Sequence, residues 1–348
     1  MSVDKNFCMN SYLALRYIVD PEMDFYTGMR HLVPTPIPAS EKIPVSTAQD
    51  IHIALERQIT ALKNRKLGVL LSGGIDSAVI ASYLSGCDAY TFRYPNNFQM
   101  EEWKRAEIYS KRYGLRLHYV DINWDTVIRS IDTVMRSKGA PVHSIEPQIY
   151  TAAIQAKADG VETVLIGDDS DYIFGGMDQI LSKDWLYDEF INWFLYLDTR
   201  EVLKSPISMA PFFEPYRKGD KIDFLRVLHG IVLEESHSSY ENAFNAAQMD
   251  WFDGYARLEM ALPLDLYRIR HGEPKYLIRE LFSMRYPDLP IPHKIPMPRP
   301  VDFYFQNWQG PSRPEFRRDM LLERYSGNQK WLLWCLEHFL NTMEPLQL

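Results

Sequence analysis

The fold is decided by the stretch Lys66-Leu-Gly-Val-Leu-Leu-Ser-Gly-Gly-Ile-Asp-Ser-Ala-Val-Ile-Ala-Ser-Tyr-Leu-Ser85. It opens with an apolar run, residues 67–71, that is too short for a helix and predicts a fully buried strand. The run breaks at Gly73 and Gly74, and apolar residues then return at helical spacing. Glycine at this turn permits backbone conformations closed to other residues and lets a ligand come close. The first N–H groups of the new helix have no internal partner, so the turn predicts an anion site.

The turn carries the pattern Ser-Gly-Gly-x-Asp-Ser. It lacks the lysine that follows the glycines in the Walker phosphate loop. Asp76 occupies the anion site instead, and a hard cation such as Mg²⁺ would relieve the repulsion between this carboxylate and bound phosphates. We therefore interpret Asp76 as a Mg²⁺ ligand beside a pyrophosphate held by Ser72, Gly73, Gly74 and Ser77. The alternative is an ordinary glycine turn with a solvated aspartate.

Length and composition exclude several classes of protein. The chain has 348 residues, of which 46% are hydrophobic, enough for the core of one large or two medium domains. Its net charge of −8 argues against a surface built for nucleic-acid phosphates. Three scattered cysteines cannot form a disulfide framework or a zinc site. Because no signal sequence and no membrane-spanning apolar run is present, we expect a soluble cytoplasmic protein.

Strands and helices are expected to alternate along the first half of the chain. Residues 11–33 predict a short helix broken by Pro21 and then a turn at Gly28, and the prolines at 34, 36, 38 and 44 predict an extended linker after them. Ser46 and Gln49 form a candidate capping box for the helix that follows. Expected strands are 67–71, 89–94, 116–121 and 161–166, and expected helices are 100–113, 124–136 and 148–158.

This rhythm predicts an α/β fold with a doubly wound parallel sheet covered on both faces. The alternation is expected to stop after Gly176, where a mostly helical part begins. The predicted organisation is an N-terminal segment and linker, 1–45, followed by a domain, 46–348. Within that domain we expect an α/β nucleotide-binding core, 46–177, and a helical part, 178–348.

A second acidic turn follows the strand expected at 161–166, and it reads Gly167-Asp-Asp-Ser-Asp-Tyr-Ile-Phe-Gly-Gly176. Three carboxylates in four residues would repel one another in a closed site, and a cation would relieve this. Ligands of doubly wound sheets bind at the carboxyl ends of strands near a topological switch. Asp76 and Asp171 are therefore predicted to flank one metal-bound pyrophosphate, the alternative being a solvated acidic loop.

The first turn resembles the pyrophosphate loop of the N-type ATP pyrophosphatases, enzymes that cleave ATP between its α and β phosphates. The order of the two turns resembles the synthetase domain of the asparagine synthetase family, which includes β-lactam synthetase and carbapenam synthetase. The second family block, Gly-Glu-Gly-Ala-Asp-Glu-Leu-Phe-Gly-Gly, is matched at positions 167, 171, 174, 175 and 176. Weaker matches are Pro274 to Arg279 and Leu289 to Lys294.

The glutaminase domain of the family is missing from this resemblance. Residues 12–33 resemble the segment that joins the two family domains, and too few residues precede it to build a glutaminase. The expected N-terminal cysteine is absent, because residue 2 is Ser2 and Cys8 lies inside the chain. We therefore expect no release of ammonia from glutamine.

The resemblance implies a fold of the adenine nucleotide α-hydrolase type and a two-step reaction. A substrate carboxylate attacks the α-phosphorus of ATP, Mg-pyrophosphate leaves, and ammonia or a small amine then attacks the acyl-adenylate and expels AMP. The resemblance places Leu70, Leu71 and Gly167 around the adenine. It also makes Lys275 the lysine that stabilises the adenylate and pyrophosphate, the alternative being a solvated lysine on a helix.

Departures from the family pattern fall on the acceptor side. The family glutamate that is a candidate base for the amine is replaced here by Asp168, which is one methylene shorter. The next acidic residue of the family motif is replaced by Tyr172. A family arginine is replaced by Ala261. These changes predict that nucleotide use is retained while the acid and the amine have diverged, as in a specialised biosynthetic pathway. The sequence names neither substrate, and it leaves a homo-oligomer open.

Two other interpretations remain. One keeps the fold in a tRNA-modifying or sulfur-transferring enzyme, which the acidic balance and the lack of a Cys-x-x-Cys pair disfavour. The other is a nucleotide-binding protein that lost catalysis, which Asp168 and Tyr172 favour. Finally, His143 and Glu146 could face an acyl pocket or could only cap the helix that follows them.

Overall fold

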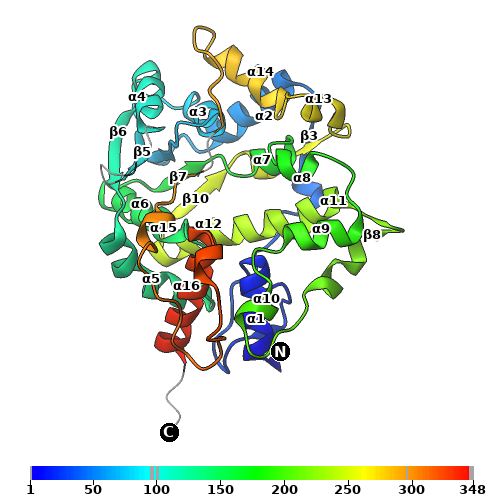
Figure 1. The fold of residues 1–348 in the computed structure, drawn as a ribbon. Coiled ribbons are helices and arrows are strands. Elements are labelled where there is room, and N and C mark those ends of the chain that lie inside the picture. Colours follow the sequence, from blue (N-terminus) through cyan, green and yellow to red (C-terminus); the bar gives the residue numbers. More distant parts are fainter. Residues whose placement is uncertain (1, 95–97, 99–101, 295–296, 345–348) are drawn as a thin grey trace.

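The computed structural model describes residues 2–94, 98, 102–294 and 297–344. At its centre lies a five-stranded parallel sheet in the order β10-β7-β4-β5-β6 (Figure 1). In that order the strands are Asp250–Asp253, Thr163–Ile166, Leu67–Leu70, Asp88–Arg93 and Arg116–Asp121. The predicted α/β class with a parallel sheet is thus confirmed.

Helices cover both faces of the sheet because the side chains of its strands alternate in direction. On β4, Leu67 and Val69 pack into a core with α2 (Ala48–Ala61), α3 (Ile75–Ala81), α4 (Glu102–Tyr113) and α14 (Tyr276–Arg285). Leu70 packs into a second core with α6 (Glu146–Ala158) and α12 (Leu233–Ala247). Every residue of β4 and β7 is buried, as the apolar runs predict.

A topological switch lies between β4 and β7. From β4 the chain moves outward to β5 and then β6, and α5 (Trp124–Lys138) and α6 bring it back to β7 on the other side of β4. Gly68 of β4 accordingly lies opposite Asp88 on one side and Val164 on the other. The turns after β4 and β7 therefore leave neighbouring strands at the same edge, where ligands of such sheets bind.

The fifth strand was not expected. The prediction that alternation stops after Gly176 is wrong, because β10 pairs in parallel with β7 along all four of its residues. Its sequence, Asp-Trp-Phe-Asp, is short and has an acid at each end, so no apolar run marks it. The position between 177 and 178 is consequently not a boundary of the sheet.

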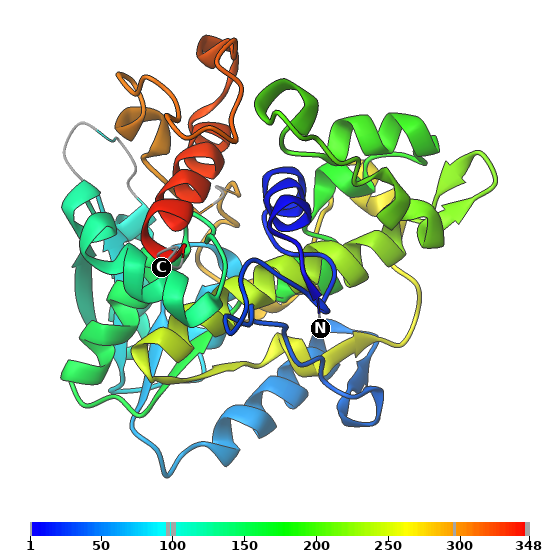
Figure 2. The same cartoon turned by 90° about the horizontal axis from the view of Figure 1, so that it is seen from below.

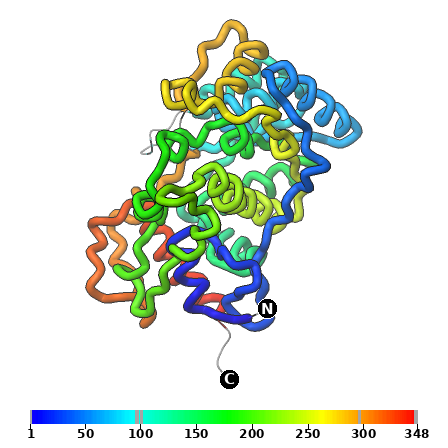
Figure 3. The backbone as a smooth tube through the Cα atoms, turned by 90° about the vertical axis from the view of Figure 1, so that its right-hand side faces the viewer, coloured from blue at the N-terminus to red at the C-terminus, as the bar shows by residue number. Residues whose placement is uncertain are grey.

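A third core joins the two ends of the chain. Helices α1 (Lys5–Leu15) and α16 (Gly327–Met343) pack side by side (Figure 2). The ring of Phe25, from the segment after α1, packs on the ring of Phe339 of α16, with 4.8 Å between the ring centroids. Both ends of the described chain lie at the same end of the molecule (Figures 1 and 3). The N-terminal segment is thus built into the body of the protein.

Several element ends differ from the expected ones. The first helix begins at Lys5 with Asp4 as its cap, and the turn at Gly28 is confirmed by a φ of +80°. The capping box of α2 is formed by Thr47 and Asp50 and not by the expected pair one residue earlier. The expected helix start at residue 100 lies outside the described residues. The first helix thus lies earlier than expected, since it ends at Leu15 and not at Pro21, whereas the other shifts are of one or two residues and leave the order of elements unchanged.

The other elements are short. They are β1 (Ser2–Val3), β2 (Met23–Asp24), β3 (Ile43–Val45), α7 (Ser170–Ile173), α8 (Asp178–Leu181), α9 (Tyr187–Phe194), α10 (Thr199–Val202), β8 (Arg217–Lys218), β9 (Lys221–Ile222), α11 (Phe224–Val227), β11 (Leu258–Met260), α13 (Leu266–Arg270) and α15 (Val301–Tyr304). Among the described residues, none of the helices is long and apolar enough to cross a membrane.

Candidate active site

The turn after β4 is a tight loop fixed by two serines. Ser77 Oγ accepts a hydrogen bond from the backbone N–H of Ser72 at 3.1 Å and lies 3.0 Å from Ser72 Oγ. Gly73 has a φ of +81°, and a Cβ at this position would lie 2.5 Å from the carbonyl oxygen of Glu102. Gly74 then precedes the first residue of α3 in an extended conformation. Glycine is therefore required at residue 73 both by conformation and by space.

The turn after β7 contacts the first turn directly. A Cβ on Gly167 would lie 3.1 Å from the carbonyl carbon of Asp76, so glycine permits the two backbones to approach. Ser170 Oγ donates a hydrogen bond to Asp76 Oδ1 at 2.6 Å. Tyr255 OH donates to the carbonyl oxygen of Asp76 at 3.2 Å. Asp76 is thus held by residues that follow two other strands of the sheet, β7 and β10.

One buried ammonium group joins the two predicted metal ligands. Lys275 Nζ lies 2.6 Å from Asp76 Oδ2 and 2.6 Å from Asp171 Oδ1, and Lys275 is only 5% exposed. Burial disfavours its charge, but Asp171 and Asp76 outweigh this effect and raise the pKa of Lys275 above its usual value. Lys275 therefore stays charged between two carboxylates, and it is neither solvated nor within a helix. It precedes α14 with a left-handed φ of +54°.

Lys294 completes the cluster around Asp171. Its Nζ donates to Asp171 Oδ1 and to the carbonyl oxygen of Gly176, both at 2.7 Å. Burial opposes the charge of Asp171, but the two lysines outweigh burial and hold its pKa below the usual range. A Cβ on Gly176 would overlap Asp171 Oδ1 and Lys275 Cε, so glycine makes room for the cluster. Sequence reasoning missed Ser170 and did not single out Lys294 within its stretch.

These groups line one cavity of about 580 Å³. The predicted site residues in its wall are Ser72, Gly74, Asp76, Ser77, Gly167, Asp168, Asp171 and Lys275. Arg279, at the end of the matched stretch 274–279, and Arg270, which sequence reasoning missed, add two more cationic side chains. The cavity therefore combines carboxylates with several cations, as expected where phosphate groups bind.

The predicted adenine residues lie in a narrow slot beside this cavity. Leu70, Leu71 and Gly167 line it together with Tyr90 and Met297, among others, and its volume is about 50 Å³. Ser72, Ser77 and Gly167 belong to the walls of both spaces. The slot and the cavity therefore meet at the two turns. The roles assigned to these residues stay predictions.

Asp168, the other predicted catalytic group, is half-buried and lies in the wall of the cavity. Its Oδ2 accepts a hydrogen bond from Ser236 Oγ at 2.7 Å. Burial, followed by the neighbouring charge of Asp169, raises the pKa of Asp168 well above its usual range. Burial and the charge of Asp169 likewise raise the pKa of Asp253 to about 7. Oδ2 of Asp253 accepts hydrogen bonds from the backbone N–H groups of Asp168 and Asp169. Burial and the charge of Asp169 both disfavour the charged form of Asp168, which is the form that a base for an amine needs.

His143 and Glu146 have different surroundings. His143 lines a second and larger cavity. Glu146 is completely buried and accepts hydrogen bonds from Lys138 Nζ and Asn242 Nδ2, both at 2.6 Å. The backbone N–H of His143 also donates to Glu146 Oε1 at 2.8 Å. Glu146 is thus part of an internal ion pair, and only His143 faces a space that a substrate can enter.

The residues fit a magnesium ion only together with a bound phosphate. Magnesium prefers oxygen ligands, keeps several waters, and is usually held by one or two carboxylates plus substrate phosphates. Asp76 and Asp171 supply such oxygens within reach of one ammonium group. Among the described residues, no three acidic, histidine or cysteine side chains form a metal cluster.

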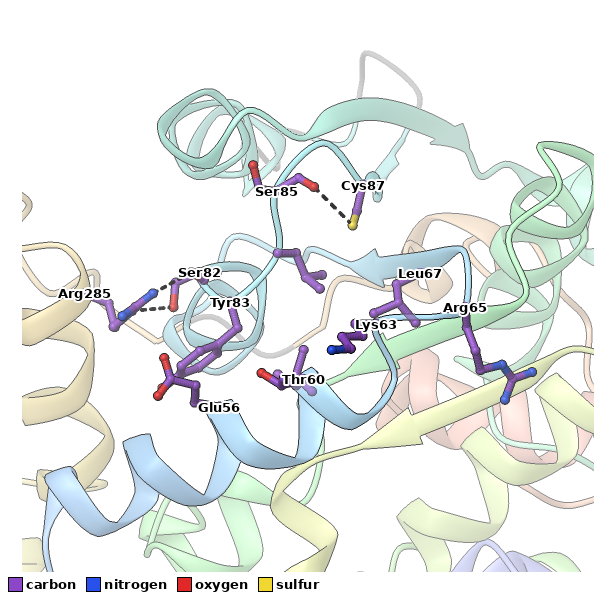
Figure 4. Close-up of a pocket in the computed structure, with 12 residues that line it drawn as sticks. Glu56, Thr60, Lys63, Arg65, Leu67, Ser82, Tyr83, Ser85, Cys87 and Arg285 are labelled. Carbon is purple, nitrogen blue, oxygen red and sulfur yellow. Dashed lines mark hydrogen bonds between the residues drawn. The ribbon is translucent and has the colours of Figure 1, made fainter.

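A further cavity, of about 380 Å³, lies at the opposite edge of the sheet (Figure 4). Its wall includes Leu67, at the start of β4, and the segment 82–85 with Cys87, which precedes β5. Arg285 is already bonded to the side chain and the carbonyl oxygen of Ser82. This cavity contains none of the predicted site residues.

Comparison with known proteins gives a family match for slightly less than half of the chain. No curated protein matches. Among solved structures, NMN synthetase from Francisella tularensis has 17% identity and a TM-score of 0.26, and the match covers 36% of this chain and 56% of that one. U34-tRNA thiolase from Methanococcus maripaludis has 13% identity and a TM-score of 0.27, covering 71% and 83%. Both TM-scores are too low to support an argument. Residues 50–220, which contain both turns of the site, match the family model of asparagine synthase.

Proposed function

We propose that this protein is an ATP-dependent, AMP-forming synthetase that adenylates a substrate carboxylate and transfers the acyl group to ammonia or a small amine. One observation carries the proposal: Asp76 and Asp171, from two neighbouring strand ends, meet the buried Lys275 in a single cavity. The match of residues 50–220 to asparagine synthase supports an ATP-using enzyme of the ligase type acting on small molecules. The parallel sheet with its site at the topological switch supports a fold of the ATP pyrophosphatase type.

In this proposal different residues of the chain bind different parts of the nucleotide. Leu70, Leu71 and Gly167 contact the adenine, and the turn of Ser72, Gly73, Gly74 and Ser77 holds the pyrophosphate part of ATP. Lys275 turns its ammonium from the carboxylates to the phosphate oxygens and stabilises the charge that develops there. Because this ammonium is buried, its interaction with the phosphates is strong.

Magnesium is the cofactor of this proposal. Asp76 and Asp171 would hold Mg²⁺, and this ion would neutralise negative charge on the departing pyrophosphate. Lys275 and Gly176 are buried, so this side of the cavity would help to keep water away from the reacting carboxylate. The cytoplasmic location and the state of assembly stay predictions.

A second candidate function is nucleotide binding without amide formation. The environment of Asp168 favours it, because burial and the neighbouring charge of Asp169 disfavour the carboxylate that would serve as the base for an amine. In this candidate the nucleotide site is intact while the acceptor half of the reaction is lost.

Pyrophosphate exchange into ATP tests the proposal. The enzyme is incubated with ATP, Mg²⁺, labelled pyrophosphate and a panel of carboxylic acids, and exchange that depends on one class of acid is expected. Asp76→Asn should abolish this exchange. The control is Glu56→Gln, which changes an exposed carboxylate in the wall of the cavity of Figure 4 and should leave the exchange unchanged. Tight ATP binding without exchange across the panel would exclude the synthetase and favour the second candidate.

A further inference from the structure

A large chamber adjoins the candidate active site. Its volume is about 870 Å³. Residues such as Asp168, Asp171 and Lys294 belong both to its wall and to the wall of the 580 Å³ cavity described above, which we call the nucleotide cavity. A substrate in this chamber could therefore place one end beside the predicted pyrophosphate site. The far wall comes from other parts of the chain, including Arg16 at the end of α1 and Trp331 on α16.

Two arginines meet at one imidazole in this far wall. Nη1 of Arg16 and Nη1 of Arg299 each lie 2.9 Å from Nε2 of His143. Because both guanidinium groups can only donate, Nε2 must be the acceptor and the proton of the neutral ring lies on Nδ1. Burial, and then the charges of Arg16 and Arg299, hold the pKa of His143 well below its usual value. His143 therefore separates the two cations without adding a third.

The negative charge near these arginines does not balance them. Arg16 Nη2 donates to Glu235 Oε2 at 2.9 Å, and the Arg16 guanidinium stacks on the ring of Tyr196 at 3.9 Å. Among the described residues, the hydrogen-bond partner of the Arg299 side chain is His143 alone. The buried atoms Nε of Arg16 and Nδ1 of His143 have no hydrogen-bond partner in the described part of the chain. The two arginines thus contact one carboxylate, that of Glu235, whose Oε1 also has no hydrogen-bond partner among the described residues, and donors of the arginine pair remain free.

The backbone of Arg16 has a conformation that non-glycine residues adopt seldom; among the described residues Gln248 and Lys275 share it. It ends α1 with a φ of +68°, a left-handed conformation at a helix end where glycine is favoured. Lys275, which has the same kind of conformation, supplies the central ammonium of the nucleotide cavity. Non-glycine residues held in this region are frequent at functional sites.

We infer that this chamber binds the acyl substrate and that Arg16 and Arg299 receive a second carboxylate of that substrate, remote from the one that reacts. The inference rests on the proposed function, because it assigns the second substrate of the same site. Arginine matches a carboxylate with two parallel hydrogen bonds, and the free donors of the pair can provide them. The chamber also presents Phe194, Trp331 and Leu332, so the substrate carries apolar bulk between its two acidic ends.

Binding of simple diacids tests the inference without any need for turnover. Linear α,ω-dicarboxylates of four to eight carbons are titrated by calorimetry, each beside its monoamide, which keeps the shape and loses one charge. We expect at least one diacid to bind roughly 10- to 100-fold more tightly than its monoamide, the size expected for hydrogen bonds to a charged group. Equal affinity of diacid and monoamide across the series would overturn the inference.

Three variants show whether the arginine pair is responsible. Arg299→Gln should abolish the preference for the diacid, and Arg299→Lys should keep only part of it, because lysine lacks the fork of donors. Arg129→Gln, an exposed arginine on α5, is the matched control and should behave as the wild type. A diacid preference that survives Arg299→Gln would refute the assignment. Circular dichroism checks that each variant is folded.

Glu235→Gln provides an opposite change should Arg299→Gln fail to fold. It removes the one carboxylate bonded to Arg16 and should therefore tighten diacid binding, whereas the monoamide should respond less. Unchanged diacid affinity in this variant would also contradict the inference. Pyrophosphate exchange separates the two proposals. If only acids without a second charge support exchange, the inference fails and the synthetase stands. If diacids bind but no acid supports exchange, the synthetase fails.

Discussion

Replacing Lys275 by methionine tests how the candidate site is held together. Methionine keeps most of the apolar stem and removes the ammonium, which lies 2.6 Å from a carboxylate oxygen of both Asp76 and Asp171. The residue is 5% exposed, so water cannot replace the lost charge easily. Asp171 keeps Lys294 as a partner, but the structure gives Asp76 no second ion pair among the described residues.

The expected loss of stability follows from this geometry. Removing one partner of a buried ion pair costs about 3–5 kcal/mol, and the remaining lysine places Lys275→Met near the lower end of that range. Lys294→Met is the matched control. The Lys294 side chain is 46% exposed, so its ion pair with Asp171 is screened by water and contributes about 0–1 kcal/mol.

The loss should also depend on pH. In the wild type the two lysines hold the pKa of Asp171 below its unfolded value, so its contribution to stability is present above that value and is lost as pH falls through the folded pKa. In Lys275→Met, burial and the neighbouring Asp76 act on Asp171 with one cation fewer, which raises its folded pKa. The folded state of the variant therefore loses less stability than the folded wild type as pH falls. The difference in unfolding free energy should therefore be largest at pH 7–8 and should shrink towards pH 4.

Urea denaturation of the wild type and both variants at pH 5 and pH 8 measures these differences. A loss below about 1 kcal/mol for Lys275→Met at pH 8, or equal losses for the two lysine variants, would refute the buried ion-pair cluster. A loss that grows as pH falls would refute the assigned direction of the Asp171 pKa.

Three further predictions concern the same site. Asp76→Asn and Asp171→Asn should each leave the circular dichroism spectrum unchanged and lower acid-dependent pyrophosphate exchange by orders of magnitude, because the metal loses a charged ligand; near-normal exchange in both would contradict their role. Gly176→Ala should cost about 1–3 kcal/mol in urea denaturation, since the added methyl group overlaps Asp171 Oδ1 and Lys275 Cε, and wild-type stability would show that the cluster can move aside. Asp168→Asn should leave pyrophosphate exchange largely unchanged and slow acyl transfer to the amine, measured as amide product; a loss of exchange itself would place Asp168 in the adenylation step.

Part of the site could be predicted from the sequence because its residues lie in two short continuous segments. The run from Leu67 to Leu70 and the run from Thr163 to Ile166 each form a buried strand, and each ends in a glycine turn with acids. In a parallel sheet the carboxyl ends of neighbouring strands lie at one edge. The alternation of elements was therefore enough to bring Asp76 and Asp171 together.

Asp168 shows a limit of such reasoning. Its place after a strand end was predicted correctly, but the backbone of the turn directs its carboxyl group to Ser236 on α12. The raised pKa follows from burial and from neighbouring acids, including Asp253 of the unexpected strand β10. No local pattern near residue 168 contains that information, because its surroundings come from segments far away in the chain.

The sequence by itself determined four of the five strands of the parallel sheet, the two glycine turns and the acids that they carry, since strand, turn and helix preferences act over a few neighbouring residues. The tertiary structure decided which cations meet these acids. Lys275 lies 199 residues from Asp76 along the chain, and Arg16 and Arg299 reach His143 from opposite ends of it. Electrostatic contacts depend on distance in space and on burial, and only the packing of α1, α12 and α14 around the sheet sets both.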